Sequence, residues 1–197
     1  EFANASNTVA VMLMTDSVIL HATEYEDFPW FYAKLEHVIS TLKKHIEGIW
    51  VSRLGLRYID FVLPRDQEEV SQYIVGELGK KPNPQVDYNS VLTAQRMQFD
   101  MGQNKGTMLV QLHCGNGQPT LPPDLSQNNL ELSDVMKRAA KHVGDCAVWD
   151  WDRFVDFSAA LDPKSLESGF KMLHDDITTA FKSFRTPFAL QECSNKP

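Results

Sequence analysis

The chain has 197 residues, and its composition is that of a globular protein, with 43% hydrophobic and 23% charged residues. These fractions exclude a chain that is disordered over most of its length. The net charge is −7, which argues against a general nucleic-acid binder, because such affinity comes mainly from neutralising phosphates. A chain of this length can fold as one compact unit, so we expect a single α+β domain over residues 1–197.

The cysteines and the apolar segments indicate the environment of the protein. Cys114, Cys146 and Cys193 have the spacing of neither a zinc motif nor a disulfide framework. We therefore expect a reducing, cytoplasmic compartment. The sequence has no apolar run long enough to span a membrane, and the polar residues 1–7 do not form a signal peptide. Because the chain lacks an initiator Met and starts next to its first predicted strand, we expect a trimmed form of a longer protein.

The first part of the chain predicts a hairpin followed by a long helix. Residues 8–14 and 18–25 are rich in β-forming residues and flank a turn-forming segment. Asp27 is suited to cap a helix, and Gly48 is suited to end it. Between them, apolar residues recur every three or four positions, which is the spacing of one helix face: Phe28, Phe31, Leu35, Val38, Leu42 and Ile46.

The later elements are predicted from the same patterns. They are a strand over 50–63, a weaker helix over 68–78, a hairpin over 90–101 and 107–114, a short helix over 134–142, a strand over 146–157, a helix over 162–184 and a loose tail over 188–197. This order predicts an α+β fold, with a mainly antiparallel twisted sheet and two long amphipathic helices packed on one face. The order also suggests two similar halves, although no residue-level repeat accompanies it.

The strand over 50–63 carries the first candidate site. Side chains alternate between the two faces of a strand, so Arg53 and Arg57 share one face with Gly55 between them, while Leu54 and Leu56 lie on the other. Guanidinium groups bind carboxylate or phosphate through paired hydrogen bonds. One interpretation is therefore a site for a small anion or an acidic peptide. The other is that each arginine pairs with a carboxylate of a neighbouring strand.

The last predicted strand supplies such carboxylates. Asp150, Asp152 and Asp156 share one of its faces, whereas Trp149 and Trp151 share the other, where we expect core packing. Carboxylates this close repel one another unless cations lie nearby, which makes Arg53 and Arg57 natural partners. The alternative for Asp150 and Asp152 is a site for Mg²⁺ or Mn²⁺, but two such carboxylates are a weak signal, and we predict no metal.

Other chemistry-bearing residues are scattered. His113 ends a predicted strand beside Cys114, and the two side chains point to opposite faces, so they do not form a nucleophile–base pair. His174 lies on the polar side of the last helix, where we expect it to be solvated. The sequence contains none of the common nucleotide-binding, zinc-protease, hydrolase or dithiol motifs. We therefore expect no cofactor.

The strand from Arg53 to Asp60 resembles the signature of a sporadically distributed bacterial protein family of unknown function, whose members show an R-(I/L)-G-L-R-Y-(I/L)-N-like run. This chain has Asp60 where the asparagine is typical. The resemblance extends at pattern level from about residue 8 to residue 185. It implies a further N-terminal segment that includes a strand, and an accessory role in bacterial defence or toxin immunity, but no established activity.

We therefore predict a non-catalytic cytosolic binding protein whose partner is another protein or a second copy, with contacts at the Arg53 and Arg57 face or the irregular segment 115–133. In self-association, the edge strands of the hairpins would pair between copies. The alternative is an enzyme or sensor for a small anionic ligand held by Arg53 and Arg57, with Asp150 or Asp152 as base and His113 as acid–base partner. Neither a membrane nor nucleic acid is an expected partner.

Overall fold

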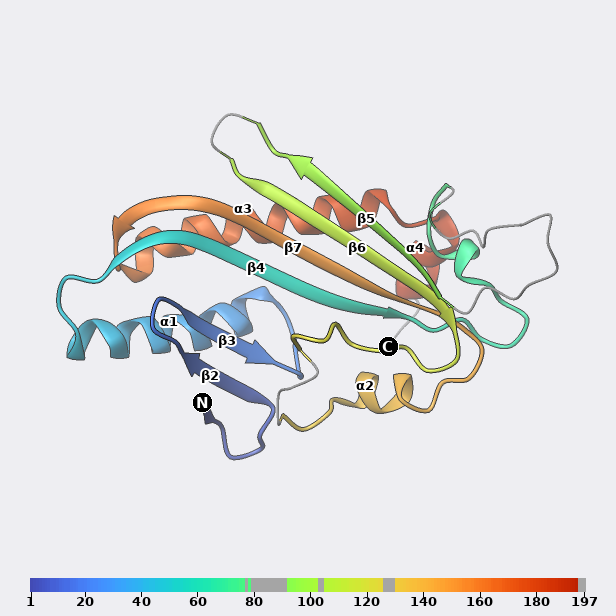
Figure 1. Cartoon of the computed structure of the whole chain (residues 1–197), viewed down its shortest axis with the longest axis horizontal. Helices are drawn as coiled ribbons and strands as arrows, with labels where there is room; N and C mark the ends of the chain where they lie inside the picture. Colours follow the sequence, from blue (N-terminus) through green and yellow to red (C-terminus); the bar gives the residue numbers. More distant parts are fainter. Residues whose placement is uncertain (77, 79–91, 103–104, 126–129, 195–197) are drawn as a thin grey trace.

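The computed structural model describes residues 1–76, 78, 92–102, 105–125 and 130–194 (Figure 1). Its strands are β1 (Phe2–Ala3), β2 (Val9–Leu13), β3 (Val18–Ala22), β4 (Trp50–Val62), β5 (Leu92–Asp100), β6 (Thr107–Asn116) and β7 (Asp145–Ala160). Its helices are α1 (Phe28–His45), α2 (Asp134–Ala139), α3 (Pro163–Ser183) and α4 (Pro187–Ser194), with one 3₁₀ turn, η1 (Val70–Gln72).

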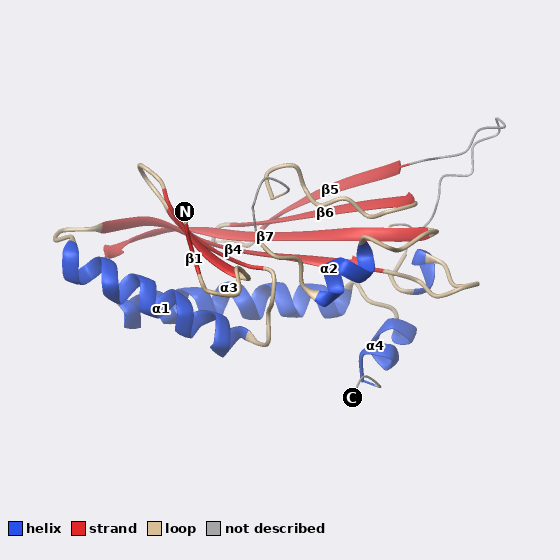
Figure 2. Cartoon of the chain, turned by 90° about the horizontal axis from the view of Figure 1, so that it is seen from below, coloured by secondary structure: helices blue, strands red, loops and turns tan. Residues whose placement is uncertain are grey.

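The strands form two antiparallel sheets, one of three strands in the order β1-β2-β3 and one of four in the order β4-β7-β6-β5. Helices α1 and α3 lie on one side of the larger sheet and leave its other face uncovered by helices (Figure 2). The α+β prediction, with an antiparallel sheet and two long helices on one face, is therefore confirmed. The single predicted sheet is divided in two, because β3 and β4 do not pair with each other.

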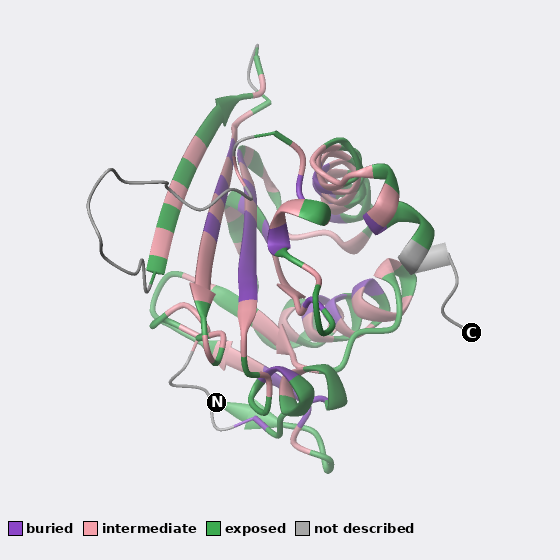
Figure 3. Cartoon of the chain, turned by 90° about the vertical axis from the view of Figure 1, so that its right-hand side faces the viewer, coloured by how far each residue is buried: buried purple, intermediate pink, exposed green. Residues whose placement is uncertain are grey.

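The core lies between the larger sheet and the two long helices. Strand β7 lies in the interior of the larger sheet and is mostly buried from Cys146 to Val155, whereas β5, at the far edge, alternates between exposed and half-buried positions (Figure 3). Trp149 and Trp151 pack against Phe181 and Phe184. Their role in the core, which the alternation of β7 predicted, is confirmed by exposures of 1% and 0%.

The helices begin where the sequence places caps. Asp27 accepts a hydrogen bond from the Trp30 amide at the start of α1, and Asp162 accepts one from the Ser165 amide at the start of α3. In the two long helices the buried side chains belong to the core, namely Tyr32, Leu35 and Ile39 of α1 and Leu166, Leu173 and Ile177 of α3. None of the helices in the described ranges is long and apolar enough to cross a bilayer.

Two predicted segments differ from the structure. The helix expected over 68–78 is reduced to η1, because the backbone after it pairs with the residues just after α3: Ile74 forms a bridge with Arg185, and Gly76 has a φ of 69°. Residue 77 lies outside the described residues. Of the tail expected to be loose over 188–197, residues 188–194 belong to α4 instead, and residues 195–197 lie outside the described residues. Ala189 is buried, and the ring of Phe188 packs edge-on against Tyr73, so tertiary contacts order a segment whose own sequence pattern is weak.

The connection from β3 to β4 through α1 sets the spacing and direction of these two strands. Both strands run in the same direction and are joined through α1, as a parallel crossover requires (Figure 1). In such a unit the two strands either pair directly or leave room for another strand between them. Here β3 and β4 do not pair, and the β2–β3 hairpin is tilted with respect to β4 (Figure 2).

Candidate functional site

The open face of the larger sheet carries the predicted site residues. The antiparallel register places Arg57 opposite Asp152 and Arg53 opposite Asp156. Asp150 lies on the same face, opposite Ile59. The sheet therefore brings the two arginines and the aspartates of the last strand onto one surface, which the spacing within each strand could not decide by itself.

Arg57 forms the strongest contact of this surface. Its Nε and Nη2 atoms donate to the two carboxylate oxygens of Asp150, each at 2.7 Å, and Gln111 Nε2 donates to the same carboxylate at 3.2 Å. A further ion pair joins Arg57 to Asp124, in the loop after β6. Hydrogen bonding to Asp150 raises the pKa of Arg57, and hydrogen bonding from Arg57 lowers the pKa of Asp124. The interpretation that this arginine pairs with a carboxylate of the last strand is confirmed.

Arg53 has a different environment. It is exposed, and its guanidinium lies 3.9 Å from the centre of the Phe154 ring. Phe154 is the cross-strand partner of Gly55, and a Cβ atom on Gly55 would meet the Phe154 side chain at 3.8 Å. Phe154 thus lies beside the glycine that separates the two arginines. Arg53 and Arg57 therefore have separate partners, an aromatic ring for one and two carboxylates for the other.

Asp152 and His113 are less closely tied to this cluster. Burial raises the pKa of Asp152, although Arg57 opposes the effect. His113 lies opposite Val148 in β7, two residues along from the pair of Gln111 and Asp150. The described structure shows no hydrogen bond or ion pair between His113 and the arginines or aspartates. Among the described residues, no group of three or more histidine, cysteine, aspartate or glutamate side chains could hold a metal ion.

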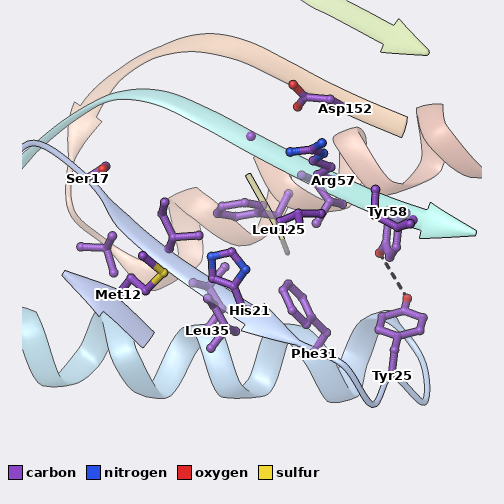
Figure 4. Close-up of a pocket in the computed structure, with 18 of the residues that line it drawn as sticks. Met12, Ser17, His21, Tyr25, Phe31, Leu35, Arg57, Tyr58, Leu125 and Asp152 are labelled. Atoms are coloured by element: carbon purple, nitrogen blue, oxygen red, sulfur yellow. Dashed lines mark hydrogen bonds between the residues drawn. The ribbon is translucent and has the colours of Figure 1, made fainter. Parts of the chain in front are cut away.

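A second feature lies beside this surface, and the sequence did not predict it. A groove of about 2130 Å³ runs between β3 and β4, with α1 beneath it (Figure 4). We call it the β3–β4 groove. The β2–β3 hairpin forms one wall, β4 forms the other, and Phe31, Leu35 and Ile39 of α1 contribute to the floor. Asp124 and Leu125 border the groove near Arg57.

Most of the exposed large hydrophobic side chains of the described structure line this groove. They are Leu13, Met14, Val18, Ile19, Tyr25, Ile46, Trp50, Leu132 and Val135. Exposed apolar residues that occur singly are ordinary, but a contiguous group marks a surface that meets another molecule. The apolar lining is therefore evidence of a binding surface.

The groove also has free backbone groups along both walls. Strands β3 and β4 are each the edge of a sheet, and within the described residues no backbone hydrogen bond is made on the edges that face the groove. An unpaired strand edge presents a row of N–H and C=O groups that can pair with another strand. The groove thus offers both apolar contacts and hydrogen-bonding groups.

Tyrosine and histidine side chains bridge the groove at one end. Tyr25, just after β3, shares a hydrogen bond with Tyr58 of β4, with their oxygens 3.2 Å apart (Figure 4). The Tyr58 oxygen lies 3.1 Å from His174 Nδ1, and the His174 ring stacks on Phe28 at 4.5 Å. Burial raises the pKa of Tyr58 and lowers that of His174. The prediction that His174 is solvated is wrong, because α3 turns this position toward Tyr58.

Asp60 is a carboxylate on the helix-covered face of β4, opposite Trp149. Burial raises its pKa to about 6, and Arg185 opposes this effect. Below about pH 4 the carboxyl is protonated in both the folded and the unfolded chain. Between about pH 4 and 6 the unfolded chain loses the proton first, so this group lowers the free energy of unfolding as the pH rises.

We expect Asp60→Asn to remove this pH dependence. The wild type should lose on the order of 2–3 kcal/mol of stability from this group between pH 4 and 7, and the variant should not. Urea denaturation at a series of pH values measures the difference, with Asp66→Asn, at an exposed position, as the control. Parallel curves for wild type and Asp60→Asn would contradict the assignment.

The comparisons with known proteins assign no family to this fold and groove. No protein-family model matches the chain, no curated protein matches it, and no solved structure matches it. The family resemblance of the strand from Arg53 to Asp60 therefore stays a prediction. What the β3–β4 groove binds has to follow from its shape, its charges and its free backbone groups.

Proposed function

We propose that this protein is a non-catalytic binding protein that takes up a segment of a partner polypeptide in the β3–β4 groove. The observation that carries the proposal is the concentration of exposed apolar side chains between two unpaired strand edges. Apolar contacts supply binding energy, and strand edges supply hydrogen bonds that only a polypeptide backbone can match along their whole length.

The size of the groove supports a polypeptide more than a small molecule. Sites for small molecules usually enclose about 300–1,000 Å³, whereas the groove has about 2130 Å³ and is lined by the hairpin, α1 and β4 together. A small ligand would leave most of this lining in contact with water. An extended segment of polypeptide would cover it.

An enzyme or sensor for a small anionic ligand has less support. That alternative needs Arg53 and Arg57 to hold one anion together. Arg57 instead directs its guanidinium at Asp150 and Asp124, and Arg53 lies on the Phe154 ring. An anion would have to displace a carboxylate from Arg57, and it would lie beside the negative charges of Asp152 and Asp150, which oppose its binding.

Selection of peptides from a random-sequence library displayed on phage tests the proposal. We expect selected peptides, made synthetically, to bind the wild-type protein in a fluorescence polarisation assay. Val18→Lys and Ile46→Lys should each weaken binding about tenfold or more, because each places a charge in an apolar contact. Val18 and Ile46 are 42% and 51% exposed, so both variants should fold.

Val143→Lys is the matched control, since Val143 is 85% exposed and lies outside the groove. It should change the affinity less than about twofold. Circular dichroism would verify that all three variants are folded. If no peptide is enriched, or if the enriched peptides bind Val18→Lys and Ile46→Lys as tightly as the wild type, the proposal is wrong.

A further inference from the structure

We infer that the segment bound in the β3–β4 groove is a single extended strand of a partner protein, inserted between β3 and β4 and hydrogen-bonded to both. The inserted strand would run antiparallel to its two neighbours. It would join the two sheets into one, in the order β1-β2-β3, inserted strand, β4-β7-β6-β5. This inference rests on the proposed function and specifies how the partner segment is bound.

The two sheets already have the same face toward the helices. In β4, Leu54 and Leu56 are buried on the helix side. In β3, Leu20 packs against the same core, so Ile19 and His21, its neighbours in sequence, lie on the opposite side. An inserted strand would therefore continue an existing layer, with one of its faces toward α1 and the other toward the open side.

A missing strand position between β3 and β4 would leave these two strands tilted with respect to each other. Neighbouring strands in a sheet are rotated by about 20–25°, so two strands separated by one position differ by about 45°. The β2–β3 hairpin is tilted with respect to β4, while β3 and β4 run in the same direction (Figures 1 and 2). A sheet built of antiparallel pairs then accommodates one strand of opposite direction between them.

The groove selects an isolated strand over the edge of a folded sheet. Both of its walls are strand edges, so the occupant must have N–H and C=O groups free on both sides. An edge strand of a second copy, such as β5, has one side already paired with β6. A second copy would also bring another net charge of −7. An extended segment that is unfolded before binding meets the requirement.

The charges at the ends of the groove define the chemistry of the partner. Asp16 lies in the β2–β3 turn at one end, and Glu24 and Glu26 follow β3 at the other. All of them are exposed, and in the described part of the chain they form no salt bridge. A complementary segment has apolar side chains at alternate positions, which face α1, and Lys or Arg at its flanks.

N-methylation of the peptide backbone tests strand insertion. The probes are the groove-dependent peptides from the phage selection, each resynthesised with one N-methyl group at successive central positions. In an inserted antiparallel strand, consecutive residues pair alternately with one neighbour and the other. Every central N-methyl group should therefore weaken binding, by about tenfold each, since each removes a hydrogen bond and crowds a flanking strand.

Other patterns would overturn the inference while leaving the proposed function intact. Sensitivity at every second position would mean pairing with only one edge. If N-methylation is tolerated at all positions of the peptide, while Val18→Lys in the protein still abolishes binding, the segment is not bound as a strand. Failure of the groove variants to weaken binding would instead overturn the proposed function itself.

Charge-removing variants test the flanking positions. The double variant Glu24→Gln/Glu26→Gln should weaken binding of a Lys- or Arg-flanked peptide about threefold to tenfold at low salt, with a smaller difference at high salt. Glu36→Gln/Glu47→Gln, at exposed positions of the chain that do not line the groove, is the matched control. Equal affinities for the two double variants would contradict a basic partner segment.

Discussion

Arg57→Ala is expected to lower the free energy of unfolding by about 3–5 kcal/mol. Asp150 is only 1% exposed, and Arg57 supplies both hydrogen bonds at 2.7 Å to its carboxylate. Removing the guanidinium leaves a buried charge whose remaining described side-chain donor is Gln111. Chemical denaturation at pH 7, with far-UV circular dichroism as the signal, measures the change.

Two further variants separate the buried pair from the exposed one. Asp124→Ala removes the other partner of Arg57, but Asp124 is 61% exposed, so we expect a loss of about 1 kcal/mol or less. The double variant Arg57→Met/Asp150→Leu removes both buried charges and should be more stable than Arg57→Ala alone. If Arg57→Ala cost no more than Asp124→Ala, the buried pair would have no special role in stability.

Asp176→Ala is the second variant for which we expect a large effect, again about 3–5 kcal/mol. Its carboxylate lies 2.9 Å from Nη2 of Arg153, which is 0% exposed. Arg153 also donates to the backbone carbonyl oxygens of Lys105, Thr107 and Phe154. This one side chain therefore connects α3, β7 and the turn of the β5–β6 hairpin.

The neighbouring residue offers a matched control for this prediction. Asp175 is 57% exposed and pairs with Lys171 on the surface of α3, so Asp175→Ala should cost about 0.5 kcal/mol or less. Both variants remove a carboxylate from the same turn of the same helix, which keeps changes in helix propensity alike. Similar losses for Asp175→Ala and Asp176→Ala would contradict the importance of the Arg153 pair.

The two buried pairs stabilise the sheet next to the proposed binding groove. Arg57 and Asp150 join β4 to β7, and β4 is one wall of the groove. In the proposed function, β4 has to keep its position while its outer edge is unpaired. The ion pair, together with the Trp149 and Trp151 core beneath β7, supplies that rigidity.

Much of the fold was predictable because its signals are local. Alternation in 50–63 and 146–157, helical spacing in 28–46 and 162–184, and capping by Asp27 and Asp162 each depend on residues close in sequence. The same alternation placed Arg57 on one face of its strand and Asp150 on one face of the last strand, but only the structure shows that the two strands pair and that these faces coincide. Charge made their pairing one of the two interpretations, because adjacent carboxylates need a cation.

Other features depended on contacts between distant segments. His174 looked solvated on its helix, but it contacts Tyr58 and Phe28, which come from other elements. Helix α4 is ordered by the packing of its Phe188 ring against Tyr73, which lies far from it in the sequence. The division of Arg53 and Arg57 between an aromatic ring and two carboxylates depended on Phe154 and on Asp124, and the position of Asp124 has no local signal.

The sequence by itself determined most of the strands and helices, which of their faces are apolar, and which charges share one face of a strand. Only the tertiary structure decided that β3 and β4 stay apart, with α1 beneath them and unpaired edges on both sides. Periodicity reports the face that a residue occupies, but it contains no information about which strand lies next to it. The β3–β4 groove arises because β3 and β4 do not pair with each other, so it exists only once the chain has folded.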